Sequence, residues 1–410
     1  MLPILERFRF CGLTVLKKKY ADQVKYCLFG LPLLSIRKHI THTSYSLFGL
    51  IPFYYQFRNQ FVKQGMICEC LCSVIPGRRR RKKYSSLLCE YLFPKSKVKV
   101  NLRSESFSSF NINDEVLLKE LRNLGTFTYI PNPGNMGDCL IAKATYDFFD
   151  RNQLNYRLYS GQCADSIVYG GGGIWVKNLY AKAYAKSLTV MKQAKKVVIL
   201  PSSVHECTQL VDILDSRFVV FCRDKRTFEY LVSQNTSAKI LMSHDMALRM
   251  TAQALQGELC VSYERYKSLL TMQDRLCSLG RVAYFFRDDV EKKFNFESQF
   301  DLSAQYGSKR MEKEEVSYAS MVMLTAVDLF DVVVTDRLHV GIAATLMGKE
   351  VYLFDNNYGK ISGVYENSLS SRPNVHLCSD LPADFPMRQT STENISCLIA
   401  TMEKQNNINE

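Results

Sequence analysis

The chain has 410 residues, of which 47% are hydrophobic and 12% are aromatic. This composition excludes a disordered chain, and the length suffices for two domains or for one domain with a large appendage. The net charge of +13 is uneven, because residues 1–103 hold 20 Lys and Arg against 4 Asp and Glu, which leaves −3 for the remainder.

The basic N-terminal arm, residues 1–103, is expected to meet an anionic partner. Its densest charge is the run 78–83, RRRRKK. Apolar and aromatic clusters around this run favour an anionic membrane surface, and no nucleic acid is expected; a merely solvated face is the alternative. The arm also repeats itself, with YCLFGLP at 26–32 and YSLFGLIP at 45–52. The two copies could be hairpins, interfacial elements or a chance similarity.

Membrane and export signals are absent from the sequence pattern. The longest apolar runs are about half of the roughly 20 residues that a membrane-spanning helix needs, and charged residues interrupt the N-terminal apolar stretch. We therefore expect a cytoplasmic protein, which the arm could hold peripherally at the inner face of the membrane.

Fourteen cysteines without paired spacing suit a reducing compartment. Cys68, Cys70 and Cys72 alternate, so they would share one face of a strand as buried thiols, with lipidation, redox or metal binding as alternatives. No second cysteine pair or histidine pair completes a zinc site, so we expect no metal.

Short apolar strands alternate with helices from Asp114 onward, after a polar linker at 104–113. We expect strands at 127–130, 156–159, 166–169, 196–200, 218–221 and 239–242, and helices at 114–124, 139–149, 177–193, 205–214 and 225–233. A second series has strands at 281–286, 331–334 and 351–354, and helices at 314–329 and 339–347. This alternation predicts an α/β fold with largely parallel sheets.

The two series predict two Rossmann-like domains that face a cleft, preceded by the basic arm. We place the arm at 1–103, the N-terminal half at 104–255 and the C-terminal half at 256–410. Ligands of such sheets bind beyond the carboxyl ends of the strands, so functional residues should follow the strands directly.

Glycine-rich turns follow two strands of the first series. PNPGNMGD at 131–138 contains Gly134 and Gly137, and four glycines occupy 170–173. Glycine lets backbone N–H groups approach a ligand, and a following helix N-terminus favours an anion, although bare turns would look the same. Asp138 could simply cap its helix, or it could face a ligand together with Asn135.

Cations and a histidine follow other strands. Arg337 and His339 come directly after the strand 331–334, where a guanidinium can bind a phosphate or carboxylate and an imidazole can transfer a proton. The alternative is that His339 caps its helix and Arg337 pairs with Asp336. Arg223 and Lys360 would add positive charge, although Arg223 could instead pair with Asp224 or Glu229.

Six motifs in order resemble those of the polysaccharide pyruvyl transferases, over about residues 125–368. They are GNMGDCLI at 134–141, YGGGG at 169–173, CRD at 222–224, HDMA at 244–247, RLHVGIAA at 337–344 and NYGKI at 357–361. The resemblance implies a fold similar to the two-domain GT-B glycosyltransferases. It also implies phosphoenolpyruvate as the donor substrate, with no further cofactor, and a sugar of a surface polysaccharide (capsule or exopolysaccharide), or of its lipid-linked precursor, as the acceptor.

The resemblance also implies roles for individual residues. Arg337 would bind the anion, and His339 would bind the anion or act as the acid, with Arg223 and Lys360 as further anion ligands. Asp138 would be the base or would orient the sugar hydroxyl. The other expected substrate-binding residues are Asn135, Gly134, Gly137, Gly171, Gly172 and Asp245.

Two other functions fit parts of the sequence. A GT-B-like glycosyltransferase would use Arg337, Lys360 and Glu366 to hold the diphosphate and ribose of a nucleotide sugar. A catalytically silent scaffold would use the arm to recruit partners at a membrane.

Overall fold

The computed structural model describes the strands between residues 4 and 57, residues 96–101, 107–162, 164–176, 179–261, 281–293 and 300–379, and three single residues, Arg265, Met272 and Leu276. The basic run 78–83 and the cysteines 68, 70 and 72 lie outside these residues. The chain divides into two compact units, one of 1–98, 260–277 and 399–410 and one of 99–259 and 278–398. The domain boundaries expected from the sequence stay predictions.

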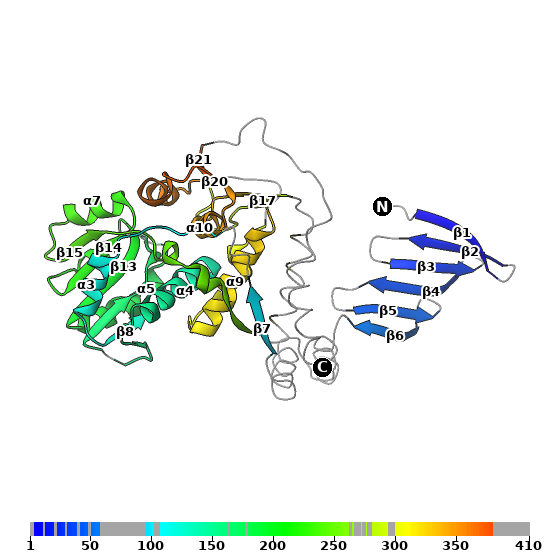
Figure 1. The fold of residues 1–410 in the computed structure, drawn as a ribbon, viewed down its shortest axis with the longest axis horizontal. Coiled ribbons are helices and arrows are strands. Elements are labelled where there is room, and N and C mark those ends of the chain that lie inside the picture. Colours follow the sequence, from blue (N-terminus) through cyan, green and yellow to red (C-terminus); the bar gives the residue numbers. More distant parts are fainter. Residues whose placement is uncertain are drawn as a thin grey trace. The chain divides into compact units, whose positions relative to one another are not determined.

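The first unit contains a six-stranded antiparallel sheet in which each strand pairs with the next along the chain (Figure 1). Its strands are β1 (Ile4–Phe10), β2 (Leu13–Lys19), β3 (Gln23–Leu28), β4 (Leu31–Lys38), β5 (His42–Leu47) and β6 (Ile51–Phe57). The two copies of the repeat form the hairpins β3–β4 and β5–β6, and the pairing register shifts at the same place in both, after Tyr26 and after Tyr45. The hairpin interpretation of the repeat is therefore confirmed.

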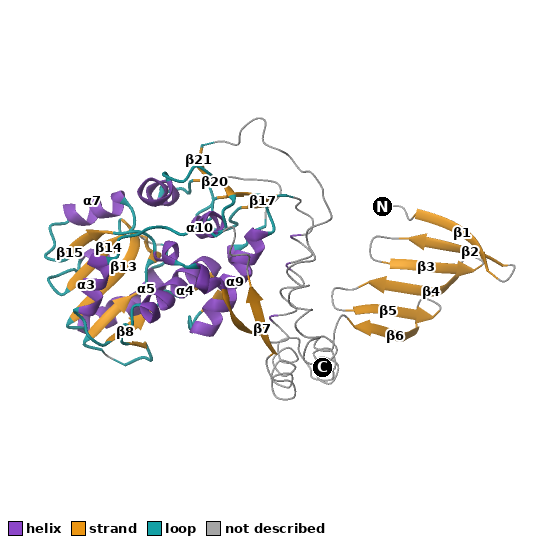
Figure 2. Cartoon of the chain, in the orientation of Figure 1, coloured by secondary structure: helices purple, strands orange, loops and turns teal. Residues whose placement is uncertain are grey.

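The second unit holds a seven-stranded parallel sheet in the order β10-β8-β11-β13-β14-β15, with β12 beside β13. Its strands are β8 (Phe127–Ile130), β10 (Tyr156–Leu158), β11 (Ser166–Tyr169), β12 (Gly172–Val176), β13 (Lys196–His205), β14 (Phe218–Cys222) and β15 (Lys239–Met242). The helices of this half are α3 (Glu115–Arg122), α4 (Met136–Arg151), α5 (Ala181–Gln193), α6 (Thr208–Val211) and α7 (Lys225–Ser233), followed by two 3₁₀ helices, Met246–Arg249 and Ala252–Leu255. Figure 2 shows these helices against the strands.

A second parallel sheet follows in the order β17-β19-β20-β21. Its strands are β17 (Val282–Phe285), β19 (Val332–Thr335), β20 (Glu350–Phe354) and β21 (Val375–Cys378). Its helices are a 3₁₀ turn at Ser303–Gln305, α9 (Lys313–Asp328), α10 (Leu338–Leu346), α11 (Lys360–Val364) and a π-helical turn at Tyr365–Leu369. Two small sheets pair β7 (Ser96–Asn101) with β16 (Gln256–Val261), and β9 (Gly134–Asn135) with β18 (Gly307–Ser308).

Helix α4 joins the two parallel sheets of this unit. It packs against α9 and α10 of the second sheet, and its apolar residues, such as Leu140 and Phe149, are fully buried. Tyr146 donates a hydrogen bond to the Met311 carbonyl at 2.9 Å. Burial of such residues is the main force that holds the halves together.

The α/β class and the parallel sheets are confirmed, whereas the two-domain GT-B arrangement stays a prediction. Two expected elements were wrong. The strand expected to end at Leu200 continues to His205, because Pro201 sits where the register shifts and no ladder donor is needed. The helix expected at 205–214 is reduced to α6, because β13 extends to His205 and the helix begins only at Thr208. Strand β12, which pairs with the extended part of β13, was not predicted, because its two glycines suggest a loop.

Candidate active site

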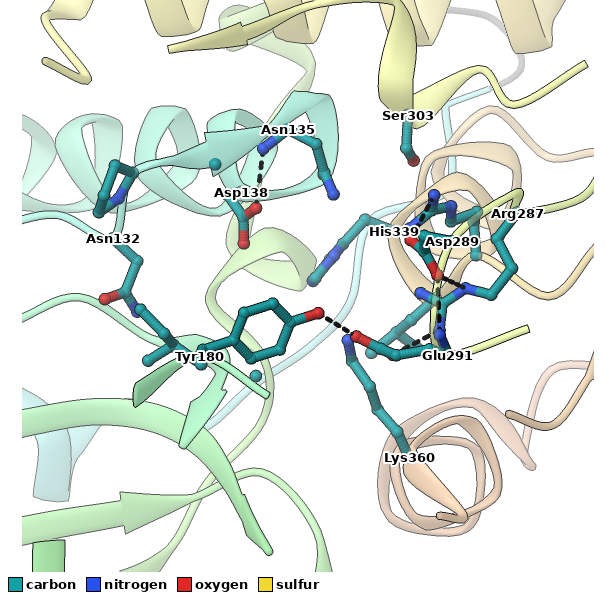
Figure 3. Close-up of a pocket in the computed structure, with 16 residues that line it drawn as sticks. Asn132, Asn135, Asp138, Tyr180, Arg287, Asp289, Glu291, Ser303, His339 and Lys360 are labelled. Atoms are coloured by element: carbon teal, nitrogen blue, oxygen red, sulfur yellow. Dashed lines mark hydrogen bonds and ion pairs between the residues drawn. The ribbon is translucent and has the colours of Figure 1, made fainter. Parts of the chain in front are cut away.

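A polar pocket lies where strands of both parallel sheets end, and Figure 3 shows it in close-up. The first sheet contributes the turn after β8, strand β12 and Tyr180; the second contributes the segments that follow β17, β19 and β20. The residues that line it are Asn132, Pro133, Gly134, Asn135, Asp138, Gly173, Ile174, Tyr180, Arg287, Asp289, Glu291, Ser303, Arg337, Leu338, His339 and Lys360.

The turn after β8 forms one wall of the pocket. Asn135 caps α4 by accepting a hydrogen bond from Gly137 N, and the Asp138 carboxylate accepts one from Asn135 N at 2.9 Å. The helix cap expected for Asp138 is therefore present, yet Asp138 also lines the pocket. Burial raises the pKa of Asp138, while the charges of His339 and Lys360 act against the rise. A half-buried carboxylate with a raised pKa can accept a proton.

Two glycines of this turn allow close packing around the acidic and basic groups. A Cβ on Gly134 would lie 1.9 Å from Asp138 Oδ2, and one on Gly137 would lie 2.8 Å from His339 Nδ1. The pairing of β9 with β18 ties the same turn to the second half of the unit. Figure 3 shows the His339 ring projecting into the space between Asp138 and Lys360.

Asp245 connects His339 to Arg223 behind the pocket wall. Arg223 Nη1 lies 2.7 Å from Asp245 Oδ2, and His339 Nε2 lies 3.5 Å from the same oxygen. Burial alone would raise the pKa of Asp245, but the contacts with His339 and Arg223 hold it below its usual range. Asp245 therefore stays ionised and can orient the imidazole. Neither Asp224 nor Glu229, the partners considered for Arg223, forms this pair.

Lys360 and the second terminal nitrogen of Arg223 meet near Gly173. A Cβ on Gly173 would lie 3.0 Å from both Arg223 Nη2 and Lys360 Nζ. Arg223 is fully buried, and its Nη2 has no hydrogen-bond partner among the described residues. Burial lowers the pKa of Lys360 to about 8, with Glu291 opposing that shift and Arg223 adding to it. Two cationic groups thus converge at this end of the pocket.

Arg337 is held by carboxylates from two different segments. It pairs with Asp301, and Asp289 Oδ2 lies 2.8 Å from its Nη2. The considered pairing of Arg337 with Asp336 is wrong, because Asp336 accepts a hydrogen bond from the Arg287 backbone N–H instead. His339 lies in the first turn of α10, but its side chain contacts Asp245 and does not cap the helix.

Glu291 organises the opposite wall and was not predicted. The buried carboxylate accepts hydrogen bonds from Tyr180, Arg287, Asn356 and Tyr358. Burial would raise its pKa, but Lys360 and Arg287 hold it below the usual range. The sequence offered one signal for this wall, because the polar segment that begins at Arg287 directly follows a strand. The partners of Glu291 from distant segments could not be predicted from the sequence.

The expected site residues divide into four groups. Six line the pocket: Gly134, Asn135, Asp138, Arg337, His339 and Lys360. Gly137 does not line it but lies against His339, because a Cβ there would be 2.8 Å from Nδ1 of that ring. Arg223 and Asp245 lie directly behind the lining residues. Gly171 packs against the Pro201 carbonyl and Gly172 against Ile141, so these two glycines support the wall without lining it.

The described residues contain neither a candidate metal site nor a membrane-spanning helix. No group of His, Cys, Asp and Glu in this part of the chain could hold a metal ion. No helix there combines the length and the apolar character needed to cross a bilayer.

Comparisons with known proteins bear on the family of the chain. No curated protein matches the chain. A solved structure of a functionally uncharacterised protein from Klebsiella pneumoniae is 32% identical, with a TM-score of 0.53, and the match covers 65% of this chain and 96% of that one. The family model "Polysaccharide pyruvyl transferase" matches residues 114–358, which include every residue of the pocket except Lys360. This match spans more than half of the chain and identifies a transferase: the chain belongs to the polysaccharide pyruvyl transferase family.

Proposed function

We propose that the protein transfers the pyruvyl group of phosphoenolpyruvate to two hydroxyls of one sugar residue, which forms a cyclic ketal and releases phosphate. The sugar belongs to a surface polysaccharide or to its lipid-linked precursor. One observation carries the proposal: a single pocket joins the cations Arg287, Arg337 and Lys360 to the proton-transfer candidates His339 and Asp138. The donor needs cations for its phosphate and carboxylate, and the transfer needs an acid and a base.

The cationic side of the pocket suits the donor. Arg337 and Arg287 offer planar guanidinium groups for the carboxylate, and Lys360 with Arg223 Nη2 offers charge for the phosphate. Burial of these groups strengthens their attraction for an anion, because water screens it less.

The opposite side suits proton transfer and the sugar. His339, oriented by Asp245, would donate a proton to the methylene carbon of phosphoenolpyruvate, so that the neighbouring carbon gains oxocarbenium character. The first sugar hydroxyl attacks this carbon, and Asp138 takes the hydroxyl proton. Phosphate leaves, the second hydroxyl closes the ketal, and its proton leaves with the phosphate. Asp138 repels an anion, which favours its placement at the sugar rather than at the phosphate.

The glycosyltransferase alternative has less support. Glu366, which would hold the ribose of a nucleotide sugar, is exposed and does not line the pocket. Ligand-induced thermal shift separates the two functions. Phosphoenolpyruvate should raise the Tm and uridine diphosphate should not; the opposite result would reject the proposal.

We also infer an anionic membrane surface as the partner of the N-terminal sheet. The basic arm that contains this sheet, residues 1–103, carries 20 Lys and Arg against 4 Asp and Glu. Clustered cations bind anionic lipid electrostatically. Full-length protein should float with phosphatidylserine vesicles and not with phosphatidylcholine vesicles, and binding to neither would reject this inference.

A further inference from the structure

Asp289 places a carboxylate in the middle of the cationic wall. Its Oδ2 lies 2.8 Å from Arg337 Nη2, and its Oδ1 lies 3.5 Å from Arg287 Nε. The residue lines the pocket, and its side chain is 36% exposed. The two arginines therefore converge on one solvent-accessible carboxylate.

Each of these arginines already has a buried counterion of its own. Asp301, whose side chain is 10% exposed, pairs with Arg337, and Glu291, at 3%, pairs with Arg287. These two pairs are neutral without Asp289. Asp289 is thus a third carboxylate, which both arginines share and which can return to water at lower cost than the buried two.

Arg287 has an N–H donor to which Asp289 does not form a hydrogen bond. Its Nε is buried and has no hydrogen-bond partner among the described residues, because the 3.5 Å approach of Asp289 does not make a hydrogen bond. A carboxylate that enters from the pocket could accept from Arg287 Nε and Arg337 Nη2 together. A buried donor that gains a partner in this way favours the complex.

We propose that Asp289 occupies the position that a substrate carboxylate would take between the two arginines, and gives it up when a small carboxylate ligand binds. The exchange keeps the charge of the wall unchanged, because one carboxylate replaces another. The assignment of phosphoenolpyruvate as that ligand rests on the proposed function. Asp289 is then an internal competitor that sets the affinity for the donor.

The test compares Asp289→Asn with Asp288→Asn. The first variant removes the competing charge but keeps an Oδ1 that can accept from Glu291 N, as Asp289 does at 3.1 Å. The control removes a neighbouring carboxylate that is 78% exposed and contacts only Lys292 at 3.4 Å among the described ion pairs. Calorimetric titration with phosphoenolpyruvate gives the dissociation constant, and steady-state kinetics give KM and kcat.

The proposal predicts that Asp289→Asn lowers the dissociation constant and KM for phosphoenolpyruvate about fivefold, the size of one partly exposed ion pair, with kcat unchanged. Asp288→Asn should match the parent. A residue that only positioned Arg337 would have the opposite effect, so a higher or unchanged KM in Asp289→Asn overturns the proposal. If Asp289→Asn does not fold, Asp289→Ala replaces it.

A second probe keeps the inference separate from the proposed function. Acetate carries the carboxylate without the phosphate, and it should bind Asp289→Asn more tightly than the parent. If the parent fails to bind phosphoenolpyruvate, the proposed donor is wrong, and the acetate titration still decides the role of Asp289. Equal acetate affinity in the two proteins rejects it.

Discussion

The Asp245 carboxylate lies 3.5 Å from Nε2 of His339, although the two residues follow strands of different sheets. The same carboxylate oxygen pairs with Arg223 at 2.7 Å. One ionised group thus neutralises a buried guanidinium and orients the imidazole that points into the pocket. The proton-transfer side of the site therefore depends on correct packing of both halves of the unit.

Asp245→Asn should lower kcat by about a hundredfold or more, because His339 loses the carboxylate that orients its ring. It should also lower the free energy of unfolding by about 3–5 kcal/mol, because Arg223 keeps a buried charge without a partner. Kinetics and urea unfolding measure the two effects.

Asp114→Asn is the matched control for this loss of stability. Asp114 lies 2.7 Å from Arg249, whose side chain is 1% exposed, and neither residue lines the pocket. It should reduce stability through the same mechanism and leave kcat near the parent value. Equal loss of kcat in the two variants would contradict the role given to Asp245.

Binding of the donor should weaken in alkaline solution because of Lys360. Burial lowers the pKa of its ammonium group to about 8, so the free enzyme loses this charge as the pH rises through that value. Above it, the KM for phosphoenolpyruvate should rise about tenfold per pH unit in the parent. Lys360→Arg should remove the rise, because a guanidinium keeps its charge, and Lys360→Met should have a high KM at every pH. A parent profile that is flat to pH 10 would reject this role.

Gly137→Ala should lower kcat more than it lowers the stability of the fold. The added Cβ would meet His339 Nδ1 at 2.8 Å and Cβ at 2.9 Å, so the ring must move. Because small displacements of a proton donor are costly, we expect kcat to fall about tenfold to a hundredfold. Cys139→Ala, in the same helical turn and buried away from the pocket lining, controls for altered packing. Its kcat should be unchanged, and a parent-like kcat in Gly137→Ala would show that the ring tolerates displacement.

The protein should become less stable as the pH rises, because the buried carboxyl of Asp336 resists ionisation. Burial raises the pKa of this carboxyl to about 6 in the folded state, from its ordinary value of 3.8, and its Oδ2 has no partner among the described residues. Between these values the unfolded chain ionises first, so the free energy of unfolding falls with pH, by about 1–3 kcal/mol in total.

Asp336→Asn removes this dependence, because an amide does not ionise and its Oδ1 can still accept from Arg287 N. The variant should be as stable as the parent at pH 4 and more stable at pH 7, as measured by urea unfolding at each pH. A variant that is less stable than the parent at pH 7 would contradict the raised pKa.

The sequence predicted the elements whose signal is local. Helix α10 begins beside His339 directly after the buried strand β19, and α4 begins in the turn that contains Gly137, both close to the expected positions. The predicted strand at 196–200 was shorter than β13, because a proline such as Pro201 usually ends a strand. Only the pairing with the neighbouring β12 shows that β13 continues past it. Local patterns cannot show which strands pair.

The same limit applies to the site. Arg337 and His339 were predicted from their place after a strand, but the carboxylates that hold Arg337 come from other segments. Asp301 lies 36 residues away in the sequence. The sequence gives no sign that Glu291 is the centre of the wall, because its partners Tyr180 and Tyr358 are distant in the sequence and reach it only in the folded chain. Ion pairs between distant segments determine the charge of the pocket. Such pairs cannot be predicted from the local pattern of a single sequence.

Acceptor-dependent release of phosphate from phosphoenolpyruvate tests the central claim most directly. Purified full-length protein, phosphoenolpyruvate and a panel of acceptors that includes a β-galactoside and N-acetylmannosamine should release phosphate with one acceptor and yield its pyruvate ketal by NMR. Arg337→Ala should abolish both signals. Phosphate release as fast in Arg337→Ala as in the parent, or sugar transfer from a nucleotide sugar in place of ketal formation, would contradict the account.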